Sequence, residues 1–202
     1  DIGAYYSYDM NDYPFDMVDS LISELKINEL LARNDSVNTD ESGEFDDWLE
    51  LFNPTDQPIS LAGLYLTDDL SELTKWQFSD SMDVIMPGDY LLIWCDEDIS
   101  QGNQHTNFKL SADGETVVLT SRNGITIIDS VSYGTQIPNQ SFGRIQDGES
   151  DWGILHPTPA YSNMQLSTVI NEIIPKNFYL FQNFPNPFNP QTIIRYNIPR
   201  ST

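Results

Sequence analysis

The chain carries short runs of β-branched and aromatic residues that recur about every ten residues, with turn-forming residues between them. No stretch between residues 24 and 164 has the apolar period of a long helix. Short strands at this spacing are typical of an antiparallel β-sandwich. We therefore predict an all-β fold with strands near residues 25–33, 47–53, 61–66, 74–78, 89–95, 115–121, 124–132 and 141–145.

The clearest turn signal is the dipeptide Asn123-Gly124, which lies between the runs TVVLTS and ITIIDSVSY. An Asn-Gly pair adopts positive φ at low cost, so it predicts a tight hairpin between two strands. Upstream, residues 18–31 fit both a helical and an alternating apolar pattern, and we expect a short helical turn followed by a strand. Further turns are predicted at Asn53-Pro54, Pro87-Gly88-Asp89 and Asp113-Gly114.

The chain is strongly acidic, because 9 Lys and Arg stand against 31 Asp and Glu in 202 residues, a formal net charge of −22. Such a surface repels phosphates and anionic headgroups, so we expect no nucleic-acid partner. No run reaches the roughly 18 apolar residues needed to span a bilayer. The 39% hydrophobic content is compatible with a packed core, and the single cysteine, Cys95, is expected in a buried strand.

Several separate segments occur in an order that resembles the lamin-tail domain, an immunoglobulin-like antiparallel β-sandwich of nuclear lamins and secreted bacterial proteins. The segments are LKINELL, FDDWLELFNP, ISLAGLYLTDD, KWQF, IMPGDYLLIW, FKLSADGETVVL, IIDSVSYG, SFGRIQDGESDW and HPTPAYSN. The resemblance spans residues 24–164. Ala160 and Tyr161 stand where the family generally has glycine, which affects a turn and leaves the expected fold unchanged.

The C-terminal run QNFPNPFNPQTIIRYNIP, residues 182–199, combines an Asn- and Pro-rich segment with a β-branched one. Proline fixes φ and removes a donor, so the first half is predicted to be extended, whereas TIIRYNI is typical of a strand. This order resembles the start of the C-terminal sorting domain of the bacterial type IX secretion system. The resemblance assigns the sorting signal to Asn183, Pro185, Asn186, Pro187, Phe188, Asn189 and Pro190.

The chain is thereby divided into four parts: a connector at 1–23, the sandwich at 24–164, a linker at 165–180 and the start of a sorting domain at 181–202. Family sorting domains continue through more strands, so the signal ending at Thr202 is expected to be incomplete. Because the first residue is Asp1, we expect this chain to be a piece of a longer protein with extended terminal segments.

The loop at 38–47 is the best metal candidate. Asn38, Asp40 and Ser42 alternate before Gly43, as oxygen ligands do in the first half of a calcium loop. The twelfth position is Leu49 instead of a bidentate Glu, so a helix-loop-helix calcium site is not supported. A looser calcium site and a solvated acidic loop remain as alternatives; the acidic runs 68–69 and 96–98 are weaker candidates. The residues of the looser site would be Asp40, Glu44, Asp46 and Asp47.

Large and charged side chains within the strands suggest core packing more than ligand binding. Trp48 of DDWLEL is expected in the core, and Asp47 and Glu50 of the same run are expected to face solvent or a partner. Arg144 is expected to form a structural ion pair. The remaining tryptophans could stack on sugar rings, but core packing is favoured for Trp76, Trp94 and Trp152.

The sequence contains no nucleophile elbow, phosphate-binding glycine loop or metalloprotease helix, so we expect no enzyme and no cofactor apart from a candidate calcium ion. The preferred hypothesis is a non-catalytic accessory or interaction module of a larger protein that is secreted or held on the outer surface of a bacterium. Its partners would be a protein or cell-surface component and, for the full-length protein, the type IX machinery. Alternatives are a calcium- or carbohydrate-binding module and a structural spacer or self-assembly unit.

Overall fold

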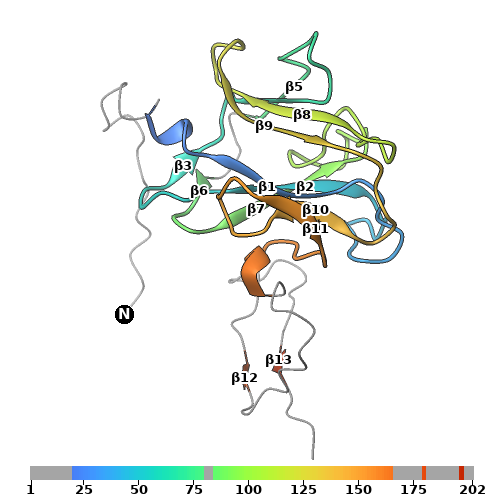
Figure 1. Cartoon of the computed structure of the whole chain (residues 1–202). Helices are drawn as coiled ribbons and strands as arrows, with labels where there is room; N and C mark the ends of the chain where they lie inside the picture. Colours follow the sequence, from blue (N-terminus) through green and yellow to red (C-terminus); the bar gives the residue numbers. More distant parts are fainter. Residues whose placement is uncertain (1–19, 80–83, 166–178, 181–195, 198–202) are drawn as a thin grey trace, which may run out of the picture. The chain divides into compact units, whose positions relative to one another are not determined.

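A computed structural model describes residues 20–79, 84–165, 179–180 and 196–197. The chain forms two compact units, residues 1–167 and 168–202, which are treated separately. In the first unit a four-stranded sheet lies over a five-stranded sheet, and all strand pairs are antiparallel (Figure 1). This arrangement confirms the predicted all-β, immunoglobulin-like sandwich.

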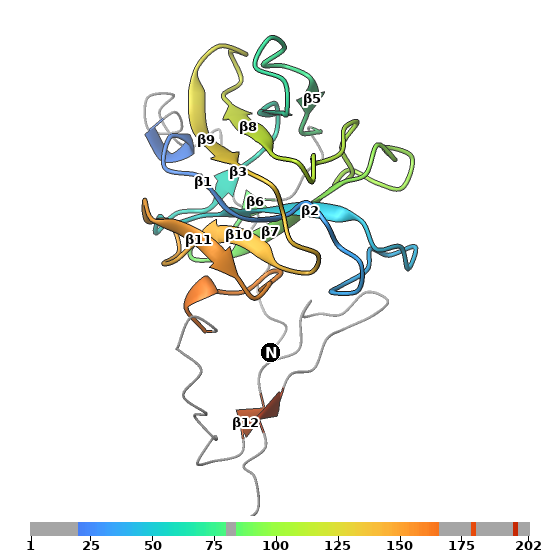
Figure 2. The same ribbon diagram turned by 45° about the vertical axis from the view of Figure 1, so that its right-hand side comes forward.

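The sheets have the orders β11-β10-β1-β2-β7 and β5-β4-β8-β9, and Figure 2 shows the two layers from a second direction. The first contains β1 (Lys26–Leu31), β2 (Asp47–Phe52), β7 (Tyr90–Cys95), β10 (Ser141–Arg144) and β11 (Trp152–Leu155). The second contains β4 (Tyr65–Thr67), β5 (Trp76–Gln77), β8 (Glu115–Thr120) and β9 (Ile127–Tyr133). A small sheet pairs β3 (Ile59–Ser60) with β6 (Val84–Ile85).

The main core fills the space between the two large sheets. Its members include Ile27, Leu30, Leu49, Leu51, Leu66, Val117, Leu119 and Val131. A β-bulge in β1 interrupts the register with β2 between Ile27 and Glu29. Because side chains of a regular strand alternate between faces, residues 27 and 30 could share the core face only across such an irregularity. The bulge also places Glu29 opposite Glu50 on the other face.

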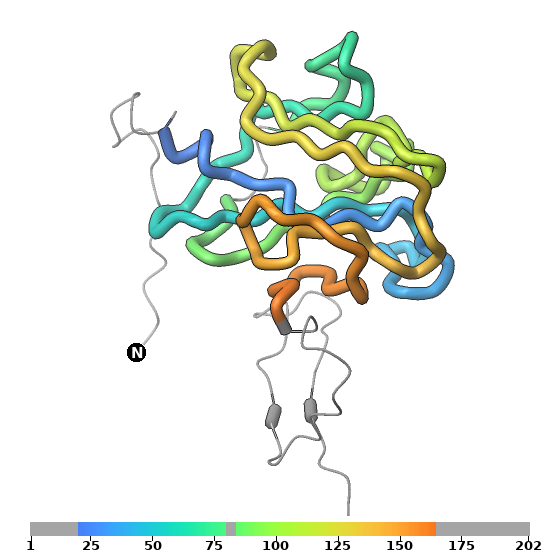
Figure 3. Tube along the Cα trace, in the orientation of Figure 1, coloured from blue at the N-terminus to red at the C-terminus, as the bar shows by residue number. Residues whose placement is uncertain are grey.

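The outer face of the five-stranded sheet is covered as well. Leu31, Trp48 and Trp94 form a second apolar cluster there, with the partly buried Val37 and Leu92 packed against it. The predictions that Trp48 and Cys95 are buried are confirmed. The segment 156–163 returns across this sheet after β11, as the tube in Figure 3 shows, and ends in the short 3-10 helix η2 (Asn163–Gln165).

Most predicted strands are present, with bounds that differ by a few residues. The prediction of one strand over 61–66 is wrong, because Leu64 N–H donates to the Leu61 carbonyl and Gly63 has a φ of +78°. This turn separates β3 from β4. The expected helical turn occupies residues 20–22, ahead of β1. The short strands β3, β6 and β11 were not predicted, nor was β12 (Tyr179–Leu180) within the expected linker.

Three of the four predicted turns agree with the backbone, whereas at Asn53-Pro54 the chain bends only from residue 55. The β8–β9 hairpin closes with Ser121 N–H donating to the Thr126 carbonyl at 2.8 Å, and Gly124 has a φ of +68°. Gly88 and Gly114 also have positive φ at their predicted turns.

Arg144 joins the two large sheets. Its Nη2 donates to Asp129 Oδ2 on β9 at 2.8 Å, and its Nε donates to the Ile27 carbonyl on β1 at 2.8 Å. Asp129 Oδ2 also accepts the Ile27 N–H, at 2.8 Å. The expected structural ion pair of Arg144 is therefore confirmed, and its partner is Asp129 on a strand of the opposite sheet.

In the second unit, β12 (Tyr179–Leu180) pairs antiparallel with β13 (Tyr196–Asn197). β13 lies inside the run TIIRYNI that was predicted to be a strand. The residues assigned to the sorting signal, Asn183 to Pro190, lie outside the described residues. Within the described part of the chain, no helix has the length and apolar character needed to cross a membrane.

Candidate functional site

Two acidic loops meet at one end of the sandwich. One loop, residues 38–46, precedes β2, and the other, residues 96–107, follows β7. Because β2 and β7 are antiparallel partners with Asp47 opposite Cys95, the start of one strand and the end of the other lie together. Strand pairing thus brings the 38–46 loop beside residues 96–98.

The 38–46 loop is held by its own polar groups. Asp40 Oδ1 accepts the backbone N–H groups of Ser42 and Glu44 at 2.9 and 2.8 Å. Gly43 permits this tight turn with a φ of +85°. The Trp48 indole N–H donates to Asn38 Oδ1 at 2.8 Å, which ties the loop to β2. These bonds fix the backbone before any ligand is considered.

The loop gathers three carboxylates. Asp40, Glu44 and Asp46 each offer an oxygen, and these atoms all lie within 4.8 Å of one another. Burial raises the pKa of Asp46, and the charges of Asp96, Asp40 and Glu44 raise it further. Three of the four residues of the predicted looser calcium site are therefore brought together.

Asp47, the fourth predicted residue, does not belong to this group of three. It is the first residue of β2, opposite Cys95, and burial raises its pKa to about 6. The weaker candidate Asp96 lies closer to the loop carboxylates: atoms of Asp40, Asp96 and His105 also lie within 4.8 Å of one another.

His105 is completely buried beside this cluster. Its Nδ1 lies 2.5 Å from Asp96 Oδ2, and its Nε2 lies 3.0 Å from Glu41 Oε1. Burial lowers the pKa of His105, but the hydrogen bonds to the two carboxylates raise it more, so the net shift is upward. The backbone of Trp94 on β7 bonds to Gln104 and Thr106 on either side of the histidine, which fixes its position.

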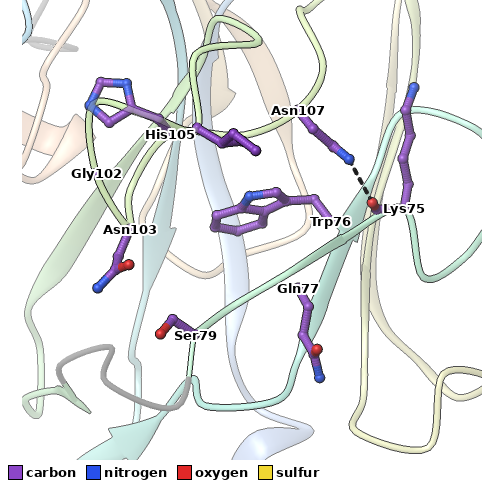
Figure 4. A pocket seen from close by; sticks show the side chains of 9 residues that line it. Lys75, Trp76, Gln77, Ser79, Gly102, Asn103, His105 and Asn107 are labelled. Atoms are coloured by element: carbon purple, nitrogen blue, oxygen red, sulfur yellow. Dashed lines mark hydrogen bonds between the residues drawn. The ribbon is translucent and has the colours of Figure 1, made fainter.

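His105 also lines a pocket of about 260 Å³ (Figure 4). The Trp76 indole lies among its polar side chains, and Asn107 Nδ2 donates to the Lys75 carbonyl at 2.8 Å. Trp76 is only 8% exposed, so little of its ring is available for stacking on a sugar. The lining residues are Lys75, Trp76, Gln77, Ser79, Ile99, Gly102, Asn103, His105 and Asn107.

The other tryptophans are also occupied by protein contacts. Trp48 and Trp94 belong to the outer apolar cluster. Trp152 stacks on Phe142 with ring centroids 5.3 Å apart, and the Arg144 guanidinium lies 4.8 Å from the Trp152 ring. These contacts favour the core-packing interpretation of the tryptophans.

A second group of carboxylates is buried in the outer face of the five-stranded sheet. Glu29 and Glu50 are completely buried. For Glu50 this corrects the expectation that the acids of DDWLEL face solvent or a partner, whereas Asp47 is partly exposed. Burial raises the pKa of Glu29 to about 7, against donors on Ser141 and Thr158 that lower it. The pKa of Glu50 is raised well above its ordinary value by burial and by the charge of Glu29.

The segment 156–163 supplies donors to these acids. Thr158 donates its N–H and hydroxyl to Glu29, and Ala160 N–H donates to Glu50 Oε2 at 2.6 Å. Asn163 N–H donates to Asp147 Oδ1 at 2.9 Å. Glu29, Glu50 and Asp147 thus hold segment 156–163 on the sheet by accepting its hydrogen bonds. The sequence offered only one hint of this use, the hydroxyl and amide residues of HPTPAYSN.

The outer edge of β11 forms a third surface feature. β11 is the end strand of its sheet, and among the described residues no strand pairs with its free edge. Ile154 on this strand is 61% exposed, and Ile145, the residue after β10, is 46% exposed. An added Cβ at Gly153 would lie 3.5 Å from the Ile145 side chain, so Ile145 lies over Gly153 on one face of the sheet. Ile154, the next residue of β11, points to the opposite face.

A comparison with protein-family models matches residues 20–135 to the family described as Lamin Tail Domain. No curated protein matches the chain, and no solved structure matches it. The matched residues include β1 to β9 and both acidic loops.

Proposed function

Because this chain belongs to the lamin tail domain family, we propose that it is a non-catalytic interaction module of a larger secreted or cell-surface bacterial protein. The module binds a protein partner by adding an extended segment of that partner to the free edge of β11. Fold alone does not assign this role, since one fold carries many functions. The proposal therefore rests on the edge itself.

The observation that carries the proposal is the apolar character of this edge. Edge strands of monomeric domains are usually protected by charges or proline, because their unpaired backbone groups can recruit another strand. β11 (WGIL) has no charged residue or proline within the strand and presents the exposed Ile154 instead. Backbone bonds from β11 would supply affinity for an added strand, and Ile154 would give one of its side chains an apolar contact.

The partner site can be tested by panning a display library of extended peptides on the whole chain. Peptides selected on the wild type should lose binding to Ile154→Asp by at least tenfold and keep binding to Ile125→Asp. Ile125 is an exposed isoleucine in the β8–β9 hairpin, so its variant is a matched control. Selected peptides that bind both variants equally would contradict the edge proposal.

The self-assembly alternative predicts that the partner is a second copy of the chain. Light scattering over a concentration series should then show a dimer that Ile154→Asp abolishes. A wild type that stays monomeric at high concentration excludes the second copy and leaves a different protein as the occupant.

Secretion is supported by the resemblance of residues 181–202 to the start of a type IX sorting domain. The test is made in the full-length protein, in a bacterium that has this secretion system. Deleting residues 183–190 should reduce the amount found outside the cell, whereas deleting residues 168–175 from the linker should not. Equal export of both deletions would refute the sorting assignment.

A further inference from the structure

We propose that Asp40, Glu44 and Asp46 form a calcium-binding site, bordered by Asp96 and the side-chain oxygen of Gln101. This site lies at the loop end of the sandwich and does not involve β11. The calcium site can therefore be tested independently of the strand addition proposed at β11.

The first argument is a buried oxygen that has no donor. Asp40 is 7% exposed, and its Oδ1 accepts two backbone N–H groups. Its Oδ2 has no hydrogen-bond partner among the described residues. A buried carboxylate oxygen without a partner is costly, and ionised carboxylates next to it can only accept. A bound cation would satisfy this oxygen.

A second buried oxygen in the same place also has no donor. Gln101 Nε2 donates to Glu44 Oε2 at 2.8 Å and to Asp98 Oδ2 at 3.0 Å, which anchors the amide beside the loop. The Gln101 Oε1 atom has no partner among the described residues. Within that part of the chain only three buried side-chain oxygens or nitrogens lack a partner, and two of them, on Asp40 and Gln101, lie at this cluster. Side-chain carbonyl oxygens are ordinary calcium ligands.

The third argument is that no lysine or arginine of the described residues forms an ion pair with these carboxylates. The ion pairs of the described lysines and arginines involve Asp35, Asp68 and Asp129, and none involves a carboxylate of the loop cluster. Oxygen atoms of Asp40, Glu44 and Asp46 lie within 4.8 Å of one another, so their negative charges repel. The backbone bonds of the loop hold these like charges together. A divalent cation converts that repulsion into attraction.

The donor chemistry selects calcium. All candidate ligand atoms are oxygens, which suit hard cations, whereas zinc prefers nitrogen and sulfur. His105 already contacts Asp96 and Glu41 through both ring nitrogens, so its role is to orient Asp96. Magnesium requires a near-ideal octahedron and keeps several waters, and an irregular loop with side-chain oxygens fits calcium better. An affinity in the range of about 10⁻⁴ to 10⁻³ M is typical of extracellular calcium modules.

The site is tested on the whole chain, freed of metal with a chelator. Calorimetric titration with calcium chloride should give a binding isotherm for one site. Millimolar calcium should raise the midpoint of thermal unfolding above its value in chelator. Magnesium chloride at the same concentration should produce a smaller rise. Terbium should bind the same site and luminesce on excitation of Trp48, which bonds to the loop at Asn38.

Asp40→Asn and Glu44→Gln should each weaken calcium binding at least tenfold, while Asp113→Asn, in an exposed turn, should bind like the wild type. Asparagine at position 40 can still accept the two backbone bonds, so the variant should fold in chelator with a midpoint at or above that of the wild type. Absence of calorimetric binding and of a midpoint shift in the wild type would overturn the site. Undiminished binding in both loop variants would also overturn it.

Discussion

Glu29 and Glu50 lie directly opposite each other on β1 and β2, and neither is exposed to solvent. Like charges on such cross-strand neighbours are destabilising, and burial adds to the cost. The sheet tolerates the pair because each carboxyl accepts hydrogen bonds. Thr158 donates to Glu29, and Asn28 and Ala160 donate to Glu50. The pair makes the stability of this domain sensitive to pH.

Stability should fall as the pH rises from about 5 to 8. Glu29 faces Glu50 on β2 and Asp147 after β10, and its pKa is raised from 4.5 to about 7. Between these values the folded protein binds the proton more tightly than the unfolded chain, so unfolding becomes easier as pH rises. The shift corresponds to at most about 3 kcal/mol of unfolding free energy, and Glu50 acts in the same direction.

Urea titrations at several pH values measure this dependence. Glu29→Gln should weaken the slope of stability against pH, because glutamine does not titrate. The exposed Glu24→Gln provides the matched control and should keep the wild-type slope. An unchanged slope in Glu29→Gln would show that this carboxyl is not the titrating group.

Thr158→Val should destabilise the domain by about 1–3 kcal/mol, because the buried Glu29 Oε2 would lose the hydroxyl donor at 2.8 Å and keep the longer bond from the Thr158 N–H at 3.2 Å. The comparison is Thr116→Val, whose hydroxyl bonds to Ser132 in an exposed position. That variant should change the unfolding free energy by less than about 0.5 kcal/mol. Equal losses in the two variants would mean that segment 156–163 is not held by the buried acids.

Arg144→Lys should cost about 2–4 kcal/mol, because lysine cannot reproduce the planar donor set that reaches Asp129, Ile27 and Glu149, and Asp129 is partly buried. Chemical denaturation measures the loss. Arg33→Lys is the control, since its ion pair with Asp35 is long at 3.9 Å and exposed. If Arg144→Lys were as stable as Arg33→Lys, the contacts of Arg144 between the sheets would not contribute to stability.

Gly114→Ala should destabilise more than Gly88→Ala. Both glycines have positive φ, which costs an alanine about 1–2 kcal/mol. At Gly114 an added Cβ would also lie 2.5 Å from the Tyr133 carbonyl oxygen, whereas at Gly88 nothing lies within 4 Å. Thermal melts of the two variants separate backbone strain from the steric clash. Similar melting points of Gly114→Ala and Gly88→Ala would show that the backbone near Tyr133 shifts at little cost to make room for the added Cβ.

Local chemistry predicted much of this fold. Residues 47–52, 90–95 and 115–120 show β-rich composition, and the turns at Gly88, Gly114 and Gly124 follow from residue preferences that act over two or three positions. The bulge of β1 was not predictable, because Asn28 gives no local signal that the alternation shifts there. The turn at Gly63 within 61–66 was missed because its neighbours are apolar and resemble a strand.

The sites were predictable only in part, because they depend on contacts between distant residues. The acidic loop was predicted to bring Asp40, Glu44, Asp46 and Asp47 together, and the first three lie together whereas Asp47 does not join them. Their proximity to Asp96 depends on the pairing of β2 with β7, which a local pattern cannot reveal. Glu50 was expected outside because an acid in an alternating strand usually is. The segment that covers it lies about a hundred positions further along the chain.

The segment 156–163 is also the last part of the sandwich before the chain continues toward its C-terminus. Any mechanical load applied through that tail reaches the bonds from Asn163, Ala160 and Thr158 to buried carboxylates before it reaches the strand ladders of β10 and β1. Under tension segment 156–163 would therefore detach from Glu29, Glu50 and Asp147 first, while the two sheets stay packed together.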